Sequence, residues 1–372
     1  MVARRTDEPG RAATPLELFF DLCFVVGVAA VSDRLHHALA EGHPERVIAY
    51  AMVFFAIWWA WMNFTWFASA YDVDDVPYRL ATFVQIAGVL ILSAGVQRAF
   101  DAKDFALIVA GYAVMRIGLV AQWLRAARGD AAGARTAHRF AIGVSACMVG
   151  WTLMLFVPEV WRLPVFIVMA LAELAVPMWA ERARNTPWHP HHIAERYGLF
   201  TLIVLGETVL AATTAIRAAL DYQGGSMELA TIALSALVIV FSMWWIYFGR
   251  NAARLLRSNR EGFRWGYGHY FIFSSAAAVG AGLGVAVDWI LHIGHVTATG
   301  AVAAVAVPVA VYLVAVWLVH VHPHRLGPLA DGAFLVAAAL VLLTMVLPPL
   351  VALPAIGVIV ASLVAVTVRA SL

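Results

Sequence analysis

Apolar runs of about 17 to 25 residues recur along almost the whole of this 372-residue chain, and each could cross about 30 Å of hydrocarbon as an α-helix. The composition agrees, since 63% of the residues are hydrophobic, 13% are charged and the mean hydropathy is +0.82. A soluble domain does not have so few charges. The sequence therefore predicts an all-α integral membrane protein.

We expect about twelve transmembrane helices in this chain. Their approximate ranges are 16–35, 47–70, 81–99, 104–124, 140–157, 162–180, 194–216, 228–249, 268–290, 299–319, 331–347 and 350–369. Pro348 and Pro349 leave open whether the last two are separate helices or one kinked helix. The polar residues 1–15 lack the features of a signal peptide, so we expect them to form a tail.

The distribution of basic residues predicts the orientation. With these spans, eighteen arginines fall on the side of the N-terminus, against five arginines and Lys103 on the opposite side. Lys and Arg in short loops are retained on the cytoplasmic side of a membrane. We therefore expect a multi-pass protein of the cell membrane with both termini in the cytoplasm.

Weak internal similarity suggests two repeats. FFDLCFVVGV at 19–28 resembles LFTLIVLGET at 199–208, and WWAW at 58–61 resembles WWIY at 244–247. Six spans separate the two copies, and an even number predicts halves that point the same way. We predict two parallel six-helix repeats, at 16–185 and 190–372.

The densest acidic cluster lies in WWAWMNFTWFASAYDVDDVPYR at 58–79, where an aromatic helix runs into Asp72, Asp74 and Asp75. Carboxylates beside a membrane core are costly unless they are solvated, paired or used. One interpretation is an aromatic belt at the lipid headgroups followed by a solvated loop. The other is a functional site.

Several stretches resemble the bacterial low-temperature-requirement A family of membrane proteins. They are ELFFDLCFVV at 17–26, the 58–79 stretch, YAVMRIGLV at 112–120, HHIAERYGLFTLIVLGETV at 191–209 and WWIYF at 244–248. The resemblance covers most of the chain. It implies a multi-spanning membrane protein and assigns no chemistry, so the chemistry must come from the residues.

The four residues Asp-Val-Asp-Asp at 72–75 resemble the DxDD motif of class II terpene cyclases, in which the middle aspartate protonates an alkene. This resemblance implies Asp74 as the general acid, supported by Asp72 and Asp75. An acid-initiated isoprenoid cyclase at the cytoplasmic membrane face would also need aromatic walls for a carbocation. The candidate walls are Trp58, Trp61, Trp66 and Tyr71. Arg250, Arg254, Arg257 and Arg260 step by three or four and could bind a diphosphate, with Mg²⁺ as the cofactor in that case.

A second hypothesis rests on charges inside the apolar runs, because such charges usually pair or line a water path. They are Glu17, Asp21, Arg116, Glu173, Glu195, Arg196 and Glu207. Asp21 and Glu207 occupy similar places in the two proposed repeats, which would suit a proton-coupled transporter or channel for a small solute. The simpler interpretation is that Glu17, Glu195 and Arg116 pair to hold helices together. A third hypothesis is a stress-related membrane protein without turnover.

Two histidine groups, at 189–192 and at 320–324, lack the spacing of a zinc motif, and we predict no metal site there. The net charge of +2 and the scattered basic residues argue against a nucleic-acid partner. The expected partners are the lipid bilayer and, under the cyclase hypothesis, an apolar isoprenoid.

Overall fold

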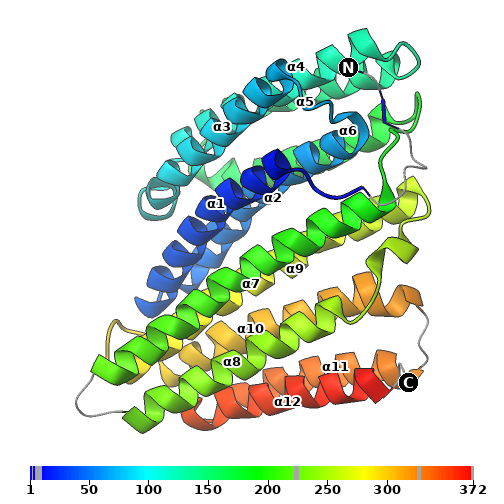
Figure 1. Cartoon of the computed structure of the whole chain (residues 1–372). Helices are drawn as coiled ribbons and strands as arrows, with labels where there is room; N and C mark the ends of the chain where they lie inside the picture. Colours follow the sequence, from blue (N-terminus) through cyan, green and yellow to red (C-terminus); the bar gives the residue numbers. More distant parts are fainter. Residues whose placement is uncertain (2, 5–10, 222–225, 325–327, 370–372) are drawn as a thin grey trace. The chain divides into compact units, whose positions relative to one another are not determined.

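The computed structural model describes the chain except residues 2, 5–10, 222–225, 325–327 and 370–372 (Figure 1). Its α-helices are α1 (Pro15–Ala40), α2 (Val47–Tyr71), α3 (Val76–Asp101), α4 (Ala106–Gly129), α5 (Ala134–Met154), α6 (Glu159–Ala180), α7 (Pro190–Asp221), α8 (Ser226–Phe248), α9 (Asn259–Ile290), α10 (Ala298–Val316), α11 (Pro328–Leu343) and α12 (Pro349–Arg369). Short 3-10 turns and a π-helical turn, Trp317–Val321, complete the described structure, which contains no β-strand. The prediction of an all-α fold with about twelve helices is confirmed.

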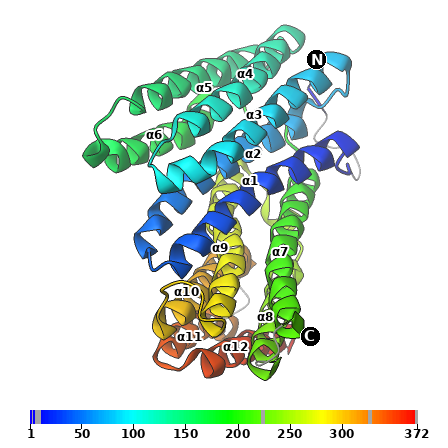
Figure 2. The same cartoon turned by 90° about the vertical axis from the view of Figure 1, so that its left-hand side faces the viewer.

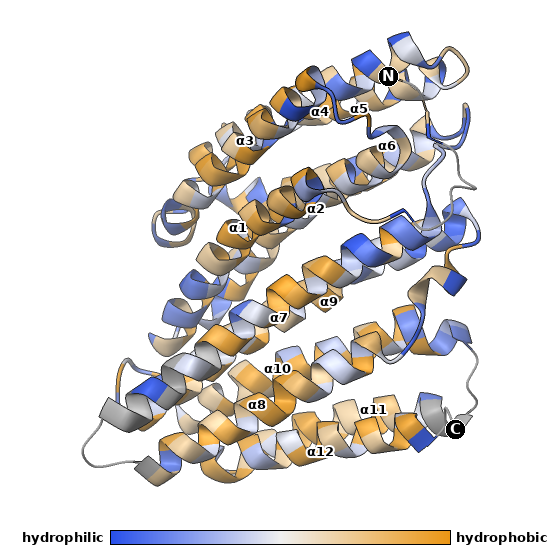
Figure 3. Cartoon of the chain, viewed as in Figure 1, coloured by the Kyte–Doolittle hydropathy of each residue, from blue (hydrophilic) through white to orange (hydrophobic). Residues whose placement is uncertain are grey.

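Nine helices in the described part of the chain are long and apolar enough to cross a membrane. Figure 3 shows apolar residues along the helices and hydrophilic residues gathered at many of their ends. In a bilayer, a helix satisfies its own backbone hydrogen bonds, which is why the apolar runs fold in this way. The chain after residue 328 forms two helices, because Leu347 and Pro348 interrupt it before α12.

The chain divides into two compact units. Unit 1 comprises Met1–Val31 and Met52–Tyr197, and unit 2 comprises Ser32–Ala51 and Gly198–Leu372. The division falls inside α1, α2 and α7. The sequence placed its repeat boundary between residues 185 and 190, and the two-repeat arrangement itself stays a prediction.

Within unit 1, α3 and α4 lie side by side (Figure 2) because small residues let their backbones approach. A Cβ added to Gly111 would lie 2.4 Å from the backbone nitrogen of Leu92. One added to Gly88 would lie 2.7 Å from the carbonyl oxygen of Gly111. No larger residue fits at either position without moving the helices apart.

Within unit 2, α9 packs against α10 in the same way. A Cβ added to Gly282 would lie 2.0 Å from the carbonyl oxygen of Ala304. Gly280 and Gly284, which flank it in the GAGLG stretch, face Thr208 and His36. These glycines allow close helix packing, as their spacing in an apolar run predicts.

Candidate functional site

The acidic segment forms the loop between α2 and α3, and its carboxylates have separate partners. Asp75 caps α3, since its Oδ1 accepts a hydrogen bond from the backbone nitrogen of Tyr78 at 3.0 Å. Arg125 on α4 also donates to Asp75, with Nη1 2.7 Å from Oδ1. Asp74 has a left-handed backbone conformation (φ 44°) and pairs with Arg79, Nε to Oδ1, at 2.8 Å. Asp72 turns into the protein.

This arrangement argues against Asp74 as a general acid. Its side chain is 52% exposed, and the hydrogen bond from Arg79 lowers its pKa. The hydrogen bond from Arg125 lowers the pKa of Asp75 in the same way. Both are therefore ionised, solvated carboxylates near pH 7. Protonation of an alkene needs a protonated carboxyl in an apolar pocket, and Asp74 is not in such a pocket.

Three of the four proposed aromatic walls have a polar group that hydrogen-bonds within the protein. Trp61 Nε1 donates to Asp21 Oδ1 at 2.7 Å, and Tyr71 Oη donates to Asp130 Oδ2 at 3.1 Å. Trp66 Nε1 donates to the hydroxyl oxygen of Tyr197 at 3.0 Å. Trp58, Trp61 and Tyr71 are all nearly fully buried. The sequence offered these residues as an aromatic belt or as pocket walls and did not predict that Trp61 donates to Asp21.

The start of α1 positions the central carboxylate. Thr14 and Glu17 form a capping box: Glu17 N donates to Thr14 Oγ1 at 3.3 Å, and Thr14 N donates to Glu17 Oε2 at 2.8 Å. Pro15 at the first helical position favours the same start. One carboxylate oxygen of Glu17 is thus used by the helix terminus. The other, Oε1, faces the protein interior.

Oε1 of Glu17 lies at the centre of a buried ion network within unit 1. We use this name for Arg11, Glu17, Asp21, Asp72, His192 and Arg196, each 9% exposed or less. Arg196 Nη1 and His192 Nε2 both lie 3.1 Å from Oε1, and Arg11 Nη2 lies 3.4 Å from it. Glu17 and Asp21 are one helical turn apart on α1, as are His192 and Arg196 on α7. The i, i+4 spacing places each pair on one face of its helix.

The network extends in two directions from Glu17. Toward the helix interior, Arg196 Nε donates to Asp21 Oδ2 at 3.0 Å. Toward the loop, Arg11 Nη2 bonds to Asp72 Oδ2 at 3.1 Å, and Arg4 lies 3.5 Å from the same oxygen. Burial and the nearby Glu17 carboxylate raise the pKa of Asp72, and burial lowers the pKa of Arg11. Asp72 is therefore the member of the acidic segment that holds a proton most readily.

A second buried charge lies on α6, also in unit 1. Glu173 accepts hydrogen bonds from Trp59 Nε1 (2.7 Å), Tyr112 Oη (2.9 Å) and Trp151 Nε1 (3.0 Å). Arg116 Nη2 lies 3.6 Å from the same carboxylate. The simpler interpretation of the sequence paired Arg116 with Glu17 and Glu195, whereas in the structure Arg116 lies beside Glu173.

The remaining candidates of the sequence lie apart from these two clusters. Glu195 is half-buried on α7 and makes no ion pair among the residues that the structure describes. Glu207 belongs to unit 2, where it is also half-buried. Neither residue joins the buried ion network.

The arginines between residues 250 and 264 do not lie on one helix. The α8 helix ends at Phe248, and Ser258 caps a new helix by accepting a hydrogen bond from Glu261 N at 3.3 Å. Arg254, Arg257 and Arg264 nevertheless line one cavity of about 1300 Å³ in unit 2. Its other walls are mainly apolar side chains of α9, α10 and α11. Arg250 and Arg260 are not among its lining residues.

The two histidine groups are dispersed. His192 belongs to the ion network, whereas His189 lies buried nearby on the same helix terminus. His320 is buried in the π-helical turn, with its Nε2 3.3 Å from Nε2 of His269 on α9. Tyr247 Oη donates to that same nitrogen of His269 at 2.9 Å. This is a hydrogen-bonded polar cluster inside unit 2.

Sequence reasoning missed Arg11 and His192 as network members. Arg11 counted only as a basic residue of the tail, and His192 as one of an interfacial histidine group. Two local signals were present: the Thr14-x-x-Glu17 capping box, and the i, i+4 spacing of His192 and Arg196.

Comparisons with known proteins agree with the described architecture. A family model described as bacterial low temperature requirement A protein (LtrA) matches residues 12–366. An uncharacterized protein of Rhizobium meliloti (strain 1021) is 29% identical over 242 residues, which cover 62% of this chain and 57% of that protein. No solved structure matches the chain. The family match includes every member of the buried ion network except Arg11.

Proposed function

The chain belongs to the bacterial low temperature requirement A family of membrane proteins, and we propose that it is a transporter that couples movement of a small solute to protons. The observation that carries this proposal is the buried ion network. Buried charges in a membrane protein are costly, and in pumps and transporters such charges serve as proton relays. In this proposal the relay begins at Asp72 and ends at Asp21.

The relay begins at Asp72, in the loop between two membrane helices. Its raised pKa makes it the group that takes a proton most easily. Protonated Asp72 no longer attracts Arg11, whose guanidinium also lies beside Glu17. Arg11 then pairs with Glu17 alone and competes with Arg196 for Oε1. Proton uptake in the loop therefore changes the charges around Glu17.

The relay ends at Asp21, one turn further along α1. Asp21 depends on Arg196 for its charge partner and on Trp61 for a hydrogen bond. When Arg196 shifts between Glu17 and Asp21, the charge available at Asp21 changes with it. A bistable ion network inside a helix bundle is the kind of element whose two arrangements can drive alternating access.

The test uses the purified protein in liposomes that contain a pH-sensitive dye. Outward or inward gradients of amino acids, organic acids, sugars and amines are imposed one at a time, and the internal pH is recorded. We expect at least one class of solute to move protons through the wild-type protein. Asp21→Asn should abolish that movement, because it removes the charge at the end of the relay.

Glu45→Gln is the matched control, because Glu45 is an exposed carboxylate paired with His43 at 3.1 Å. It should transport as the wild type does. Coupled transport that survives both Asp21→Asn and Glu17→Gln would refute the network as the proton path. A protein that moves no solute in the panel, while folded and inserted, would leave the third hypothesis of a membrane protein without turnover.

The second candidate is the isoprenoid cyclase, and one observation favours it. The cavity in unit 2 has arginines among apolar walls, a combination that fits an amphiphile with an anionic head. Against it stands the exposed, ionised Asp74. If the acidic segment supplies a proton donor, its burial and raised pKa make Asp72 that donor.

Membranes that contain the protein should then be incubated with polyprenyl alcohols and diphosphates, with and without Mg²⁺. Cyclic products are sought by gas chromatography and mass spectrometry. A product that is lost in Asp74→Asn supports the original assignment, and one lost only in Asp72→Asn moves the acid to Asp72. The absence of any product counts against the cyclase.

A further inference from the structure

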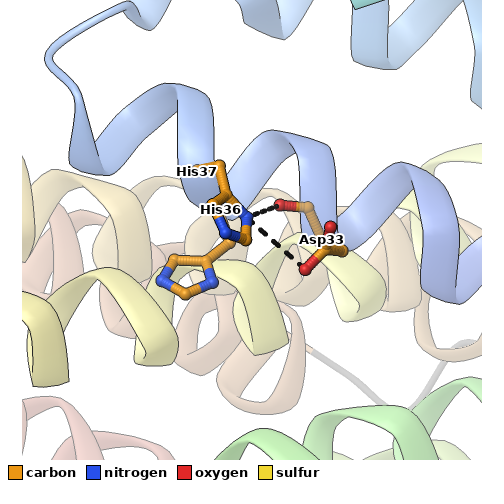
Figure 4. A group of neighbouring side chains, drawn as sticks. All are labelled: Asp33, His36 and His37. Carbon is orange, nitrogen blue, oxygen red and sulfur yellow. Dashed lines mark hydrogen bonds and ion pairs between the residues drawn. The ribbon is translucent and has the colours of Figure 1, made fainter. Parts of the chain in front are cut away.

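A cluster of histidine and aspartate side chains lies near the end of α1, within unit 2 and outside the ion network. Asp33, His36 and His37 each offer a ligand atom, and these atoms all lie within 4.8 Å of one another (Figure 4). The spacing i, i+3, i+4 places the three side chains around one helical turn. His36 is half-buried, whereas Asp33 and His37 are exposed. Water and ions can therefore reach the cluster.

Both histidine rings are held by one nitrogen, which leaves the other nitrogen available. His36 Nε2 lies 2.7 Å from Asp288 Oδ2 on α9, and its Nδ1 has no hydrogen-bond partner among the residues that the structure describes, so Nδ1 can act as a ligand. His37 Nδ1 bonds to the backbone carbonyl oxygen of Asp33 at 2.8 Å, and its Nε2 remains. Histidines that bind metals almost always donate their second ring nitrogen to a carboxylate or a carbonyl in this manner.

The oxygens of Asp33 are divided between two neighbours. Oδ2 accepts from Arg34 Nη2 at 2.9 Å, while Oδ1 lies 3.4 Å from His37 Nδ1. Arg34 therefore occupies one oxygen, and the other lies on the histidine side. Carboxylate and imidazole together are the donors that Zn²⁺ and similar transition metals prefer.

The negative charge around the cluster favours the binding of a cation. Asp33, Asp288 and Glu207 contribute three carboxylates, and Asp33 repels Glu207 electrostatically. Among the described residues, Glu207 has no hydrogen bond or ion pair that would offset this repulsion. Arg34 is the only arginine or lysine paired with any of the three in the described part of the chain. A divalent cation would neutralise the excess negative charge.

We propose that Asp33, His36 and His37 bind a divalent transition metal ion of the Zn²⁺ type, with Asp288 orienting His36 from outside the coordination shell. Ligand atoms around Zn²⁺ lie about 3.3 Å apart when each bond is about 2.0 Å long, so the side chains must draw together slightly. Two of the three are exposed and can change rotamer to do so. Water completes the coordination. This site is independent of the transport proposal.

The test is isothermal titration calorimetry of the purified, tag-free protein. Zinc chloride, calcium chloride and magnesium chloride are titrated in separate experiments. We expect one zinc ion per chain and at least tenfold weaker binding of calcium and magnesium, which prefer oxygen ligands. His36→Ala and His37→Ala should each weaken zinc binding by at least tenfold. Asp288→Asn should weaken it by about 10 to 100-fold, as loss of an orienting partner does.

His43→Ala is the matched control, since His43 is an exposed histidine paired with Glu45. It should bind zinc as the wild type does, and size-exclusion chromatography checks that every variant is folded. Absence of stoichiometric zinc binding to the wild type would overturn the proposal. Equal affinity in the wild type, His36→Ala and His37→Ala would do the same, because the zinc would then bind elsewhere.

Discussion

Replacing Arg196 with methionine tests whether the buried ion network is ionised as described. Arg196 is fully buried and bridges Glu17 and Asp21. Methionine keeps much of the side-chain volume but removes the charge. Glu17 retains Arg11 and His192 as neighbours, whereas among the described residues Asp21 retains only the hydrogen bond from the indole of Trp61. The loss of the charge partner therefore affects Asp21 more than Glu17.

Removing one partner of a buried ion pair costs about 3 to 5 kcal/mol, because the other charge stays buried without compensation. We expect a loss of this size in the free energy of unfolding. Adding Asp21→Asn should recover about 2 kcal/mol, since it removes the stranded charge. Arg98→Met is the control, because Arg98 is 63% exposed and lies 3.7 Å from Asp104. An exposed pair of this kind contributes about 1 kcal/mol or less.

The measurement is equilibrium unfolding in mixed micelles of a mild detergent and dodecyl sulfate, followed by tryptophan fluorescence and circular dichroism. Four proteins complete the cycle: the wild type, the two single variants and the double variant. An Arg196→Met variant within about 1 kcal/mol of the wild type would refute the reasoning. So would a double variant no more stable than Arg196→Met, because Asp21 would then not be the stranded charge.

Three further predictions use the same unfolding assay. Burial raises the pKa of Glu181 to about 7. The contribution of protonated Glu181 to stability is therefore fully present below its ordinary pKa and is lost as the pH rises through about 7. Between pH 5 and 8.5 the free energy of unfolding of the wild type should fall by about 2 kcal/mol relative to that of Glu181→Gln. Glu173→Leu should cost about 3 kcal/mol or more, because Trp59, Tyr112 and Trp151 lose their acceptor, whereas a loss below about 1 kcal/mol would contradict this role. Gly111→Ala should cost about 1 to 3 kcal/mol by separating α3 from α4. Gly206→Ala, where an added Cβ meets nothing within 4 Å, should instead raise stability by up to about 1 kcal/mol, because alanine is the better helix former.

The helices were predictable from length and hydropathy because lipid leaves the backbone few alternatives to a helix. The charges of the network were partly predictable as well, since Glu17, Asp21 and Arg196 interrupt apolar runs and therefore need partners. Their pairing was not predictable. Asp21 and Arg196 are 175 residues apart, and no periodicity in the sequence links them. Only the packing of the helices within unit 1 brings them together.

The acidic segment shows why a high density of acidic residues along the sequence is a poor guide to a shared site. Asp72, Asp74 and Asp75 are near neighbours in the chain, yet their arginine partners come from the tail, α3 and α4 respectively. The loop turns at Asp74 through a left-handed conformation, which separates the directions of the side chains. Each acid therefore titrates in its own surroundings, and only Asp72 is buried.

That difference decides which carboxylate in the network is suited to exchange protons. Protonation of Glu17 would weaken its contacts with Arg11, His192 and Arg196 and the cap of α1 together. Protonation of Asp72 weakens its attraction to Arg11 and Arg4 and the hydrogen bond from the backbone nitrogen of Asp74, and it leaves the contacts of Glu17 with His192 and Arg196 and the cap of α1 in place. Asp72 is also the carboxylate of the network that lies in a loop, between α2 and α3. Protons should therefore enter the network at Asp72, with Glu17 as a fixed charge whose arginine partners rearrange around it.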